Sequence, residues 1–387
     1  MERRGIIYLD HAATSYPKPL AVRNEVARCL CEYGGNPGRG SHVLSMRAAE
    51  KVYECRERLA SFFGVEDPER IMFTMNTTYA LNLVLKGLIR EGDHVILSDM
   101  EHNAVWRPLY RWEQEGKIQT DTFRSGAEVG TGAINVCEAI EKVLRKESRL
   151  LVCAQASNIC SLELPIREIA QFCHDHGLLF VVDGAQSAGH FPIRVDEWGI
   201  DALCIPGHKG LLGPQGCGVL ILGKGVAPET LLQGGNGVYS LEGEMTDQFP
   251  ERYEVGTLPT PAIAGLSEGI QVLERIGLEN VCAYERWLSR YAKELLGNTE
   301  GIHLYAPWYE GSILLFDVKG WSSEEVGAWL NEAGICVRSG HHCAALAHKT
   351  LCTPENGAVR VSLGMTNRRA DIDSLWKALR ALQKEER

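Results

Sequence analysis

The stretch LLFVVDGAQSAGHFPIRVDEWGIDALCIPGHK, residues 178–209, decides the fold. It predicts a buried strand over residues 178–182 that ends on Asp183, then a loop, a short helix and a second strand over residues 202–205 that runs into Lys209. A carboxylate and a lysine at the ends of neighbouring apolar strands are costly to bury unless a ligand uses them. Pyridoxal phosphate (PLP) would use both, because a lysine can hold it as a Schiff base while a carboxylate pairs with its pyridinium nitrogen.

The composition is typical of an ordinary globular protein. At 387 residues the chain is long for one hydrophobic core, so we expect two domains. The formal net charge of -10 argues against nucleic acid or an anionic membrane as a partner, because such binding depends on clustered Lys and Arg. No apolar run reaches membrane-spanning length, and the N-terminus lacks the apolar core of a signal peptide. We therefore expect a cytoplasmic protein with no membrane partner.

The thirteen cysteines are scattered along the chain, and no CxxC pair occurs. Several of them, Cys153, Cys173, Cys204 and Cys217, lie inside apolar runs and are expected to be small buried hydrophobes. A disulfide framework is typical of short secreted chains, which this is not. Reduced thiols are therefore expected.

Strand-like runs alternate with helical patterns over about 150 residues, which is typical of a mainly parallel sheet with its ligands at the carboxyl ends of the strands. The strand-like runs are residues 70–74, 94–98, 118–123, 150–154, 178–182, 202–205 and 218–222. The helical patterns are residues 45–63, 77–90, 103–114, 136–146 and 165–176. The fold class is therefore α/β, with a seven-stranded sheet.

The remaining segments suggest a smaller second domain of α+β type. Residues 1–40 are expected to be irregular and residues 233–260 to be an extended connection. A single long helix over residues 261–297 is expected to link the two domains. The elements after it are strands at 311–318, 335–338 and 358–362, helices at 323–333 and 370–384, and a loop at 339–357. We expect a large domain over residues 19–260 and a small one formed by residues 1–18 and 261–387.

Polar side chains gather at the predicted carboxyl ends of the strands of this one sheet. Each alone has a simpler explanation: Thr77, Thr78 and Asp183 could be helix caps, His102 a solvent-facing loop residue and Asn158 a turn residue. Thr77 and Thr78 open a helix, where free N–H groups favour phosphate. Gln186 would point to the same edge if a helix begins there. Their shared position favours one cofactor site with His208 and Lys209.

A second cluster surrounds Cys343, in the segment RSGHHC at residues 338–343, with Arg360 following in AVRVSLG. A cysteine in a glycine-containing loop near arginines is a candidate nucleophile, because positive charge favours thiolate over thiol. Arg338, His341 or His342 could supply that charge. Arg360 could hold a substrate carboxylate in a bidentate fork. The alternatives are a structural loop or a metal site, and the Cys and His spacing matches no common zinc pattern.

Across nearly the whole chain the sequence resembles class V aminotransferase-fold enzymes, in particular the cysteine desulfurase and selenocysteine lyase group. The matching motifs are YLDHAATSYPKP, NPGRGSHVLS, TTYALN, SDMEHNAVWRP, VVDGAQSAGH, GHKGLLGPQGCGVL, RYEVGT, RSGHHCA and VRVSLGMTN. The resemblance implies the PLP-dependent transferase fold of type I and the conversion of L-cysteine to L-alanine. The short interval between Cys343 and Arg360 is similar to the subgroup with a compact catalytic loop, which usually passes sulfur to a partner protein.

The resemblance also implies a role for each matching residue. Lys209 would hold PLP and act as the base, Asp183 would pair with the ring nitrogen, Gln186 and Asn158 would contact the ring hydroxyl, and His102 would stack on the ring. Thr77, Thr78 and His208 would bind the phosphate, and Thr257 would reach the phosphate of the opposite subunit of a homodimer. Arg360, with Arg338, Asn158 and Ala13, would bind the substrate, and Cys343 would accept the sulfur. No metal is implied.

The sequence departs from the group at two places. Pro206 stands where relatives commonly have a serine, so one hydroxyl and one N–H that could contact phosphate are missing. The segment AALAHKTLCTPENG after Cys343 is unusual and brings a second thiol, Cys352. Three alternatives therefore stay open: a selenocysteine lyase, another class V PLP enzyme that does not use Cys343, and a non-catalytic sulfur- or metal-binding protein.

Overall fold

The computed structural model describes residues 5–38, 40–128, 134–235 and 237–385. The predicted strands form one seven-stranded sheet, and each boundary lies within two residues of its prediction. The strands are β2 (Ile71–Thr74), β3 (His94–Ser98), β4 (Gln119–Phe123), β5 (Ser148–Ala154), β6 (Leu179–Asp183), β7 (Ala202–Pro206) and β8 (Gly218–Leu222). Their order in the sheet is β2-β8-β7-β6-β5-β3-β4, and only β8 runs antiparallel to its neighbours. The expected α/β fold with a mainly parallel sheet is confirmed.

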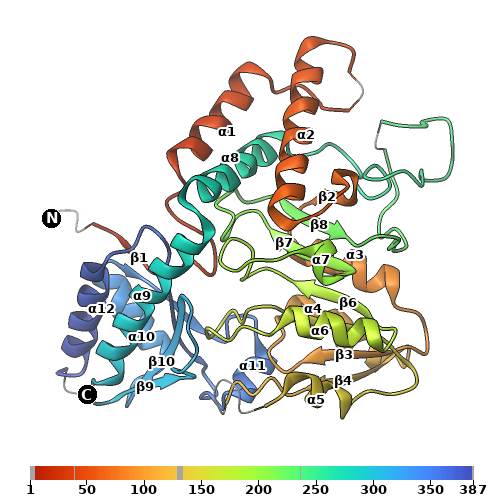
Figure 1. Cartoon of the computed structure of the whole chain (residues 1–387). Helices are drawn as coiled ribbons and strands as arrows, with labels where there is room; N and C mark the ends of the chain where they lie inside the picture. The colour runs from red at the N-terminus through yellow and green to blue at the C-terminus, as the bar shows by residue number, and fades with distance from the viewer. Residues whose placement is uncertain (1–4, 39, 129–133, 236, 386–387) are drawn as a thin grey trace.

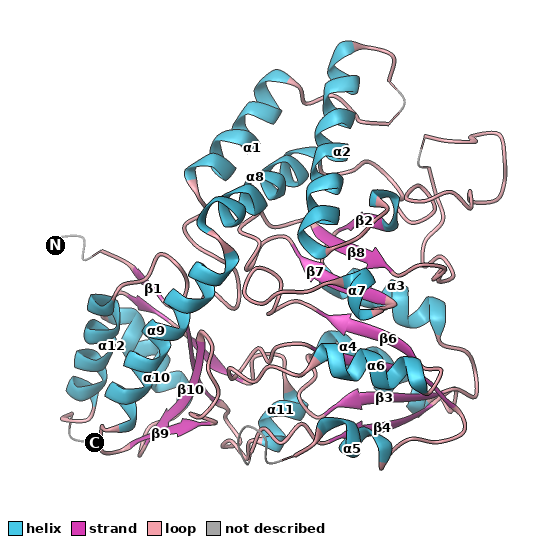
Figure 2. Ribbon diagram, viewed as in Figure 1, coloured by secondary structure: helices cyan, strands magenta, loops and turns pink. Residues whose placement is uncertain are grey.

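Helices cover both faces of this sheet, as Figures 1 and 2 show. Helices α3 (Thr77–Leu88) and α4 (Asn103–Gln114) pack on one face. The other face carries α2 (Val43–Phe63), α5 (Val136–Glu141), α6 (Ile166–Asp175), the short α7 (Val195–Trp198) and part of α8 (Thr260–Ile276). Burial on both sides explains why the strands other than β4 are almost continuously apolar rather than alternating. The strand β4 lies at the edge of the sheet and is mostly polar.

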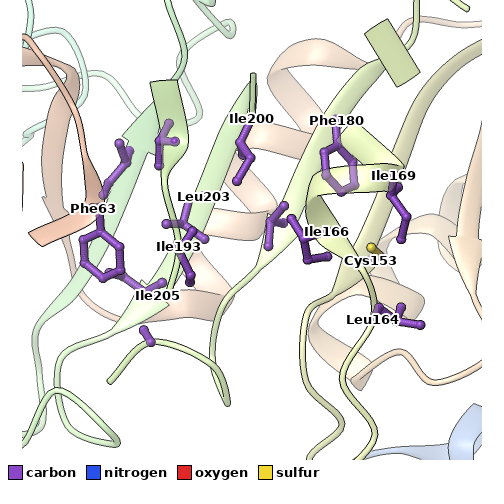
Figure 3. Close-up of a cluster of buried hydrophobic side chains, with 14 of the residues drawn as sticks. Phe63, Cys153, Leu164, Ile166, Ile169, Phe180, Ile193, Ile200, Leu203 and Ile205 are labelled. Atoms are coloured by element: carbon purple, nitrogen blue, oxygen red, sulfur yellow. The ribbon is translucent and has the colours of Figure 1, made fainter. Parts of the chain in front are cut away.

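Side chains along each central strand point alternately into the two cores. Leu150 and Val152 of β5 belong to the core under α3 and α4, whereas Leu151 and Cys153 belong to the core under α6. Figure 3 shows part of the second core, where Phe180 lies among side chains of neighbouring strands and α6. This packing fixes the register of the strands and therefore the position of every side chain at their carboxyl ends.

A smaller group of elements forms at the other end of the molecule (Figure 1). It contains the strands β9 (Ile302–Tyr305), β10 (Ile313–Val318), β12 (Arg338–Gly340) and β13 (Ala358–Ser362), in the antiparallel order β12-β13-β10-β9. Helices α9 (Leu278–Gly297), α10 (Ser323–Glu332) and α12 (Arg369–Leu382) pack around a core of their own. The division into domains at residues 18–19 and 260–261 stays a prediction, since apolar side chains of α8 lie in the core of the large sheet.

Several sequence predictions outside the large sheet are wrong. Residues 1–40 are not irregular, because they contain β1 (Ile7–Tyr8) and α1 (Leu20–Glu32). The face of α1 that is buried includes Glu25, which accepts a hydrogen bond from the Tyr33 hydroxyl, so the expected apolar stripe is interrupted. The single helix over residues 261–297 is two helices, broken at Gly277, whose φ of 86° is unfavourable for other residues.

The segment that follows α10 also differs from its prediction. The strand expected over residues 335–338 is two short strands, β11 (Ile335–Cys336), which pairs with β1, and β12, which pairs with β13. The loop expected over residues 339–357 contains α11 (Ala345–Thr350). The strand β9 was not predicted, and the helix expected over residues 136–146 ends at Glu141. Across the described part of the chain, no helix has both the length and the apolarity needed to cross a lipid bilayer.

A buried ion pair ties the segment after β8 to the large sheet. Arg56 of α2 donates from both terminal nitrogens to the carboxylate of Glu254, each at 3.0 Å, and also donates to the Ile71 carbonyl. The Glu254 carboxylate accepts from the backbone N–H of Phe73 at 2.7 Å. Both side chains are less than a tenth exposed. These bonds fix the position of the segment that carries Thr257.

Replacing Arg56 by methionine should lower the free energy of unfolding by roughly 3–5 kcal/mol, because Glu254 would be left buried without its partner. Arg58, on the same helix, pairs with Glu274 at a partly exposed position and provides the control. Arg58→Met should cost at most about 1 kcal/mol. Urea denaturation of the two variants tests this, and equal losses would contradict it.

Candidate functional site

The carboxyl ends of the strands surround a cavity of about 110 Å³. Eight of the residues singled out from the sequence line it. They are Thr77, Thr78, His102, Asn158, Asp183, Gln186, His208 and Lys209. The structure therefore brings together, at one edge of one sheet, residues that are up to about 130 positions apart in the chain.

Asp183 is the last residue of β6, and Lys209 follows β7, the adjacent parallel strand. Burial lowers the pKa of Lys209 to about 8, and Asp183 partly opposes this effect. Burial also raises the pKa of Asp183, while a hydrogen bond of 2.9 Å from the Ala185 N–H and the charge of Lys209 lower it. Each group therefore affects the ionisation of the other, as expected for two charges that share a dry site.

The amino end of α3 provides hydrogen-bond donors at the wall of the cavity. Asn76 caps the helix by accepting from the Tyr79 N–H at 2.9 Å. The hydroxyl of Thr77 is buried and has no hydrogen-bond partner among the described residues. An unpaired buried hydroxyl beside free helix N–H groups fits a phosphate or another anion. Capping by Thr77 itself, the simpler reading of the sequence, is excluded because Asn76 is the cap.

His102 and His208 are both neutral near pH 7. Burial lowers the pKa of each to about 4, and for both the charge of Lys209 adds to that effect. His102 caps α4 by accepting from the Ala104 N–H through Nδ1 at 3.0 Å, which fixes the position of its ring. A neutral, fixed imidazole can pack against a flat aromatic ligand, and Ala185 supplies a small side chain to the same cavity.

Gln186 and Asn158 connect the cavity with other segments. Gln186 lies in a turn rather than at the start of a helix, and its side chain donates to the Ala12 carbonyl at 2.9 Å. Asn158 donates to the His342 carbonyl at 2.8 Å. The cavity is thus joined to the N-terminal segment on one side and to the Cys343 loop on the other.

The loop that carries Cys343 is held at the rim of the cavity. The Cys343 carbonyl accepts from the Asn103 N–H at 2.8 Å, directly after His102. His342 and Cys343 have φ angles of 52° and 56°, a left-handed conformation that non-glycine residues rarely adopt. Since Cys343 is exposed, the loop presents a free thiol beside the cavity.

A chain of hydrogen bonds within the loop maintains this strained conformation. His342 donates from Nε2 to the Arg338 carbonyl at 3.1 Å, so its Nδ1 accepts from His348 at 3.1 Å. His348 in turn accepts from the Thr353 hydroxyl at 2.7 Å. Burial, followed by the charge of Arg360, lowers the pKa of His342 to about 3. His342 therefore cannot supply the positive charge that the sequence suggested for it.

Arg338 and Arg360 lie on the paired strands β12 and β13 and share one carboxylate, that of Asp10. Arg360 is 2% exposed and donates to Asp10 and to the Asn158 carbonyl, both at 2.8 Å, while its Nε has no partner in the described ranges. Burial lowers its pKa, with Asp10 and Cys343 acting in the opposite direction. A guanidinium with an unused buried donor fits an additional anion.

Five predicted site residues do not line the cavity, namely Cys343, Arg338 and Arg360, described above, and Ala13 and Thr257. Ala13 does not line it but belongs to the turn in which Ala12 meets Gln186. Thr257 lines a different hollow, of about 380 Å³, together with Arg56 and Glu254. Within the described residues, no group of three or more His, Cys, Asp or Glu side chains could hold a metal ion.

Two residues of the site were missed from the sequence. Asp10 follows the two-residue strand β1, which is too short to leave a pattern, although an acid at a strand end was the signal that identified Asp183. Lys18 donates to the His208 carbonyl at 2.6 Å and to the Ser15 hydroxyl at 2.7 Å. No sequence pattern marks it.

The lowered pKa of Lys209 predicts that its amine becomes reactive at an unusually low pH. Reductive methylation of the cofactor-free protein with formaldehyde, followed by peptide mass spectrometry, should show half-maximal labelling of Lys209 near pH 8, because the neutral amine is the reactive form. Lys224 provides the control, because its hydrogen bond to Glu66 raises its pKa. If Lys209 and Lys224 label with the same pH dependence, the claim that burial lowers the pKa of Lys209 is wrong.

Comparison with known proteins identifies the family. A model of the Aminotransferase class-V family matches residues 7–375. A probable cysteine desulfurase from Methanothermobacter thermautotrophicus is 35% identical over 385 residues, which cover 97% of this chain and 94% of the relative. A cysteine desulfurase from Shigella sonnei is 32% identical over 393 residues, which cover 98% and 94%.

Solved structures agree with these sequence relatives. An apo structure of the cysteine desulfurase from Thermococcus onnurineus superimposes with a TM-score of 0.88 at 31% identity, covering 97% of this chain and 94% of the other. The cysteine desulfurase CsdA from Escherichia coli superimposes with a TM-score of 0.87 at 28% identity, covering 98% and 95%. The fold is therefore that of the type I PLP-dependent transferases, and enzymes of this family depend on PLP. The chain belongs to the class V aminotransferase family and, within it, to the cysteine desulfurases.

Proposed function

We propose that the protein is a PLP-dependent cysteine desulfurase that converts L-cysteine to L-alanine and passes the sulfur, as a persulfide on Cys343, to an acceptor. The observation that supports the proposal is that an exposed thiol lies next to the cavity that contains Lys209 and Asp183. The loop that carries this thiol is hydrogen-bonded to Asn103 and Asn158 at the rim of the cavity. A PLP enzyme without a sulfur-accepting step would need only the cavity.

The residues of the cavity fit PLP. Lys209 would hold its aldehyde carbon and Asp183 its ring nitrogen. The unpaired Thr77 hydroxyl, Thr78, His208 and the N–H groups of α3 would bind its phosphate. Pro206 lines the cavity but has neither a hydroxyl nor an N–H to donate to the phosphate. The hydrogen-bond donors at the amino end of α3 would compensate for that loss.

The same cavity supplies groups for the ring of PLP. His102 would lie against the ring, and Asn158 and Gln186 would contact its hydroxyl. When bound, PLP supplies an electron sink that makes the Cα proton of an amino acid acidic.

The side chains of this protein would then position the substrate and move its protons. Arg360 would bind the carboxylate of L-cysteine, and Arg338, Asn158 and Ala13 would also contact the substrate. Lys209 would take the proton from Cα, and its lowered pKa makes a useful fraction of the amine neutral near pH 7. Cys343 Sγ would attack the substrate sulfur, so that an S–S bond forms, the S–Cβ bond breaks and Cβ takes up a proton. Cα then regains a proton in place of the one that Lys209 removed. The products are alanine and a persulfide on Cys343.

The position of Thr257, outside the cavity of its own chain, supports a homodimer in which Thr257 reaches the phosphate site of the partner. We further propose that the protein acts in the cytoplasm and passes sulfur to a partner protein. L-Selenocysteine is an alternative substrate, because it differs from L-cysteine by one soft atom.

Three variants test the proposed function. Lys209→Ala should abolish both the visible Schiff-base absorption of the holoprotein and all formation of alanine. Cys343→Ala should keep the absorption but lose alanine formation from L-cysteine by at least about a hundredfold, because the nucleophile is missing. Cys352→Ala is the matched control, since Cys352 is also exposed, also has a positive φ and lies in the same loop, and it should keep activity. Wild-type alanine production by Cys343→Ala would exclude the desulfurase mechanism.

Subunit mixing tests the assignment of Thr257. In a homodimer of Lys209→Ala chains, both PLP sites lack the lysine. In a homodimer of Thr257→Ala chains, both sites lack the threonine, which weakens PLP binding when PLP is limiting. A mixed dimer should regain one intact site, formed by the Lys209 of one subunit and the Thr257 of the other. Activity and PLP binding of mixed dimers should therefore exceed those of both parents. If mixing restores nothing, Thr257 acts within its own subunit or not at all.

A further inference from the structure

Another cavity, here called the Arg23 cavity, has a volume of about 310 Å³. It lies where the N-terminal segment meets α8, α9 and the turn after Lys209. Lys209 is the one described residue that lines both this cavity and the cofactor cavity, and the proposed reaction does not use the Arg23 cavity. Arg23 itself is exposed in the first turn of α1, so the cavity reaches the surface. A small molecule could therefore enter it without passing through the cofactor cavity.

The walls of the Arg23 cavity are mostly apolar. They include Leu20 of α1, Val272 of α8, and Leu212 and Met365 from two turns. A hollow of this size, with apolar walls and a few converging polar groups, is typical of sites for small molecules. A ligand that fills it would need an apolar body to replace water at these walls.

The charged groups of the cavity leave two cations without an acid. Six of the described residues that line it can carry a charge: His11, Lys18, Arg23, His190, Lys209 and Glu285. The one acid among the six is already paired, because His190 Nδ1 lies 2.8 Å from Glu285 Oε2. Burial lowers the pKa of His190, but the charge of Glu285 and this hydrogen bond raise it by more. Since Lys209 would hold PLP, Lys18 and Arg23 remain as the cations for a ligand.

Lys18 and His11 also have hydrogen-bonding capacity that the described residues leave unused. Lys18 Nζ donates to the His208 carbonyl at 2.6 Å and to the Ser15 hydroxyl at 2.7 Å, which takes two of its three N–H groups. His11 is 9% exposed, and its Nε2 is buried with no partner in the described ranges. Burial lowers the pKa of His11 to about 4, so its ring is neutral near pH 7 and can donate one N–H. An ammonium and an imidazole with spare donors on one cavity fit a carboxylate.

We propose that the Arg23 cavity is a second ligand site, which binds small monocarboxylates that have an apolar body. The carboxylate would contact Lys18, Arg23 and His11, and the apolar body would pack against Val272 and Met365. The inference goes beyond the proposed function and does not depend on it, because binding to the cavity can be measured without turnover.

The probe is 3-phenylpropionate, and its amide, which has the same shape without the charge, is the control ligand. Titration calorimetry of the PLP-saturated protein at pH 7 should show one 3-phenylpropionate bound per chain. The amide should bind about tenfold more weakly, because it cannot form charge-assisted hydrogen bonds with the two cations. Arg23→Gln and Lys18→Met should each weaken 3-phenylpropionate about tenfold and change binding of the amide little.

Arg28→Gln is the matched control variant. Arg28 is exposed on the same helix, pairs with Glu25 and does not line the cavity, so its replacement should leave binding of the probe unchanged. Absorption of bound PLP and circular dichroism check that each variant is folded. If Lys18→Met does not fold, Arg23→Gln tests the same site at an exposed position.

The pH dependence of binding tests the contact with Lys18. Burial lowers the pKa of Lys18 to about 8, so its ammonium loses the proton between pH 7 and pH 9. The affinity of the wild type for 3-phenylpropionate should therefore fall about fivefold over this range. Lys18→Arg stays charged and should keep most of its affinity at pH 9. His11 and His208 are neutral throughout, and the His190–Glu285 pair is the same in both proteins.

The outcomes decide the inference without reference to sulfur chemistry. No binding of the probe, equal binding of the acid and the amide, or unchanged binding in both Arg23→Gln and Lys18→Met would overturn it. So would displacement of the probe by excess L-alanine, because the probe would then occupy the substrate site. The desulfurase assignment stands under each of these results and fails only if the wild-type protein forms no alanine from L-cysteine.

Discussion

A lysine in the wall of the cavity and a buried carboxylate, at the ends of two adjacent parallel strands, are the constraint on which the rest of the site depends. Lys209 and Asp183 are placed by β7 and β6, whose apolar side chains fill both cores of the large sheet. Neither group would be stable in such a place alone, because burial disfavours the charged form of each. Their opposite charges reduce that cost, and a ligand that contacts both would reduce it further.

The other parts of the site are brought to this pair by segments from distant parts of the chain. The N-terminal segment contacts the cavity through Ala12 and Lys18 and contacts the arginines through Asp10. The Cys343 loop contacts it through Asn103 and Asn158. The Cys343 loop, the two arginines and Asn158 therefore belong to one connected set of hydrogen bonds, and the loop and Asn158 join that set to the cavity that holds Lys209. This arrangement fits a reaction in which one substrate is bound, deprotonated and attacked in a single place.

Much of this could be predicted from the sequence, and the limits have physical causes. The strands of the large sheet other than the polar edge strand β4 were predictable because burial on both faces makes them continuous apolar runs, and polar residues at their carboxyl ends mark the site. Helix α1 was missed because a hydrogen-bonded glutamate, Glu25, interrupts its apolar face. Strand β1 is too short to show any periodicity, so Asp10 was missed with it.

Features that depend on tertiary contacts could not be inferred from the order of residues. The sequence suggested three cations for the thiol, but the burial of His342 keeps that side chain neutral. His342 and Cys343 likewise have a left-handed conformation that no local pattern marks, and their carbonyls accept from Asn158 and Asn103, which are far away in the chain.

The central claim is that Lys209 is the covalent anchor of PLP, and it can be tested without any assumption about sulfur chemistry. The purified protein is saturated with PLP, reduced with borohydride to fix the linkage, digested and analysed by peptide mass spectrometry. The account predicts one pyridoxyl group per chain, on the peptide that contains Lys209. A group fixed on another lysine, or no fixed group at all, would contradict it.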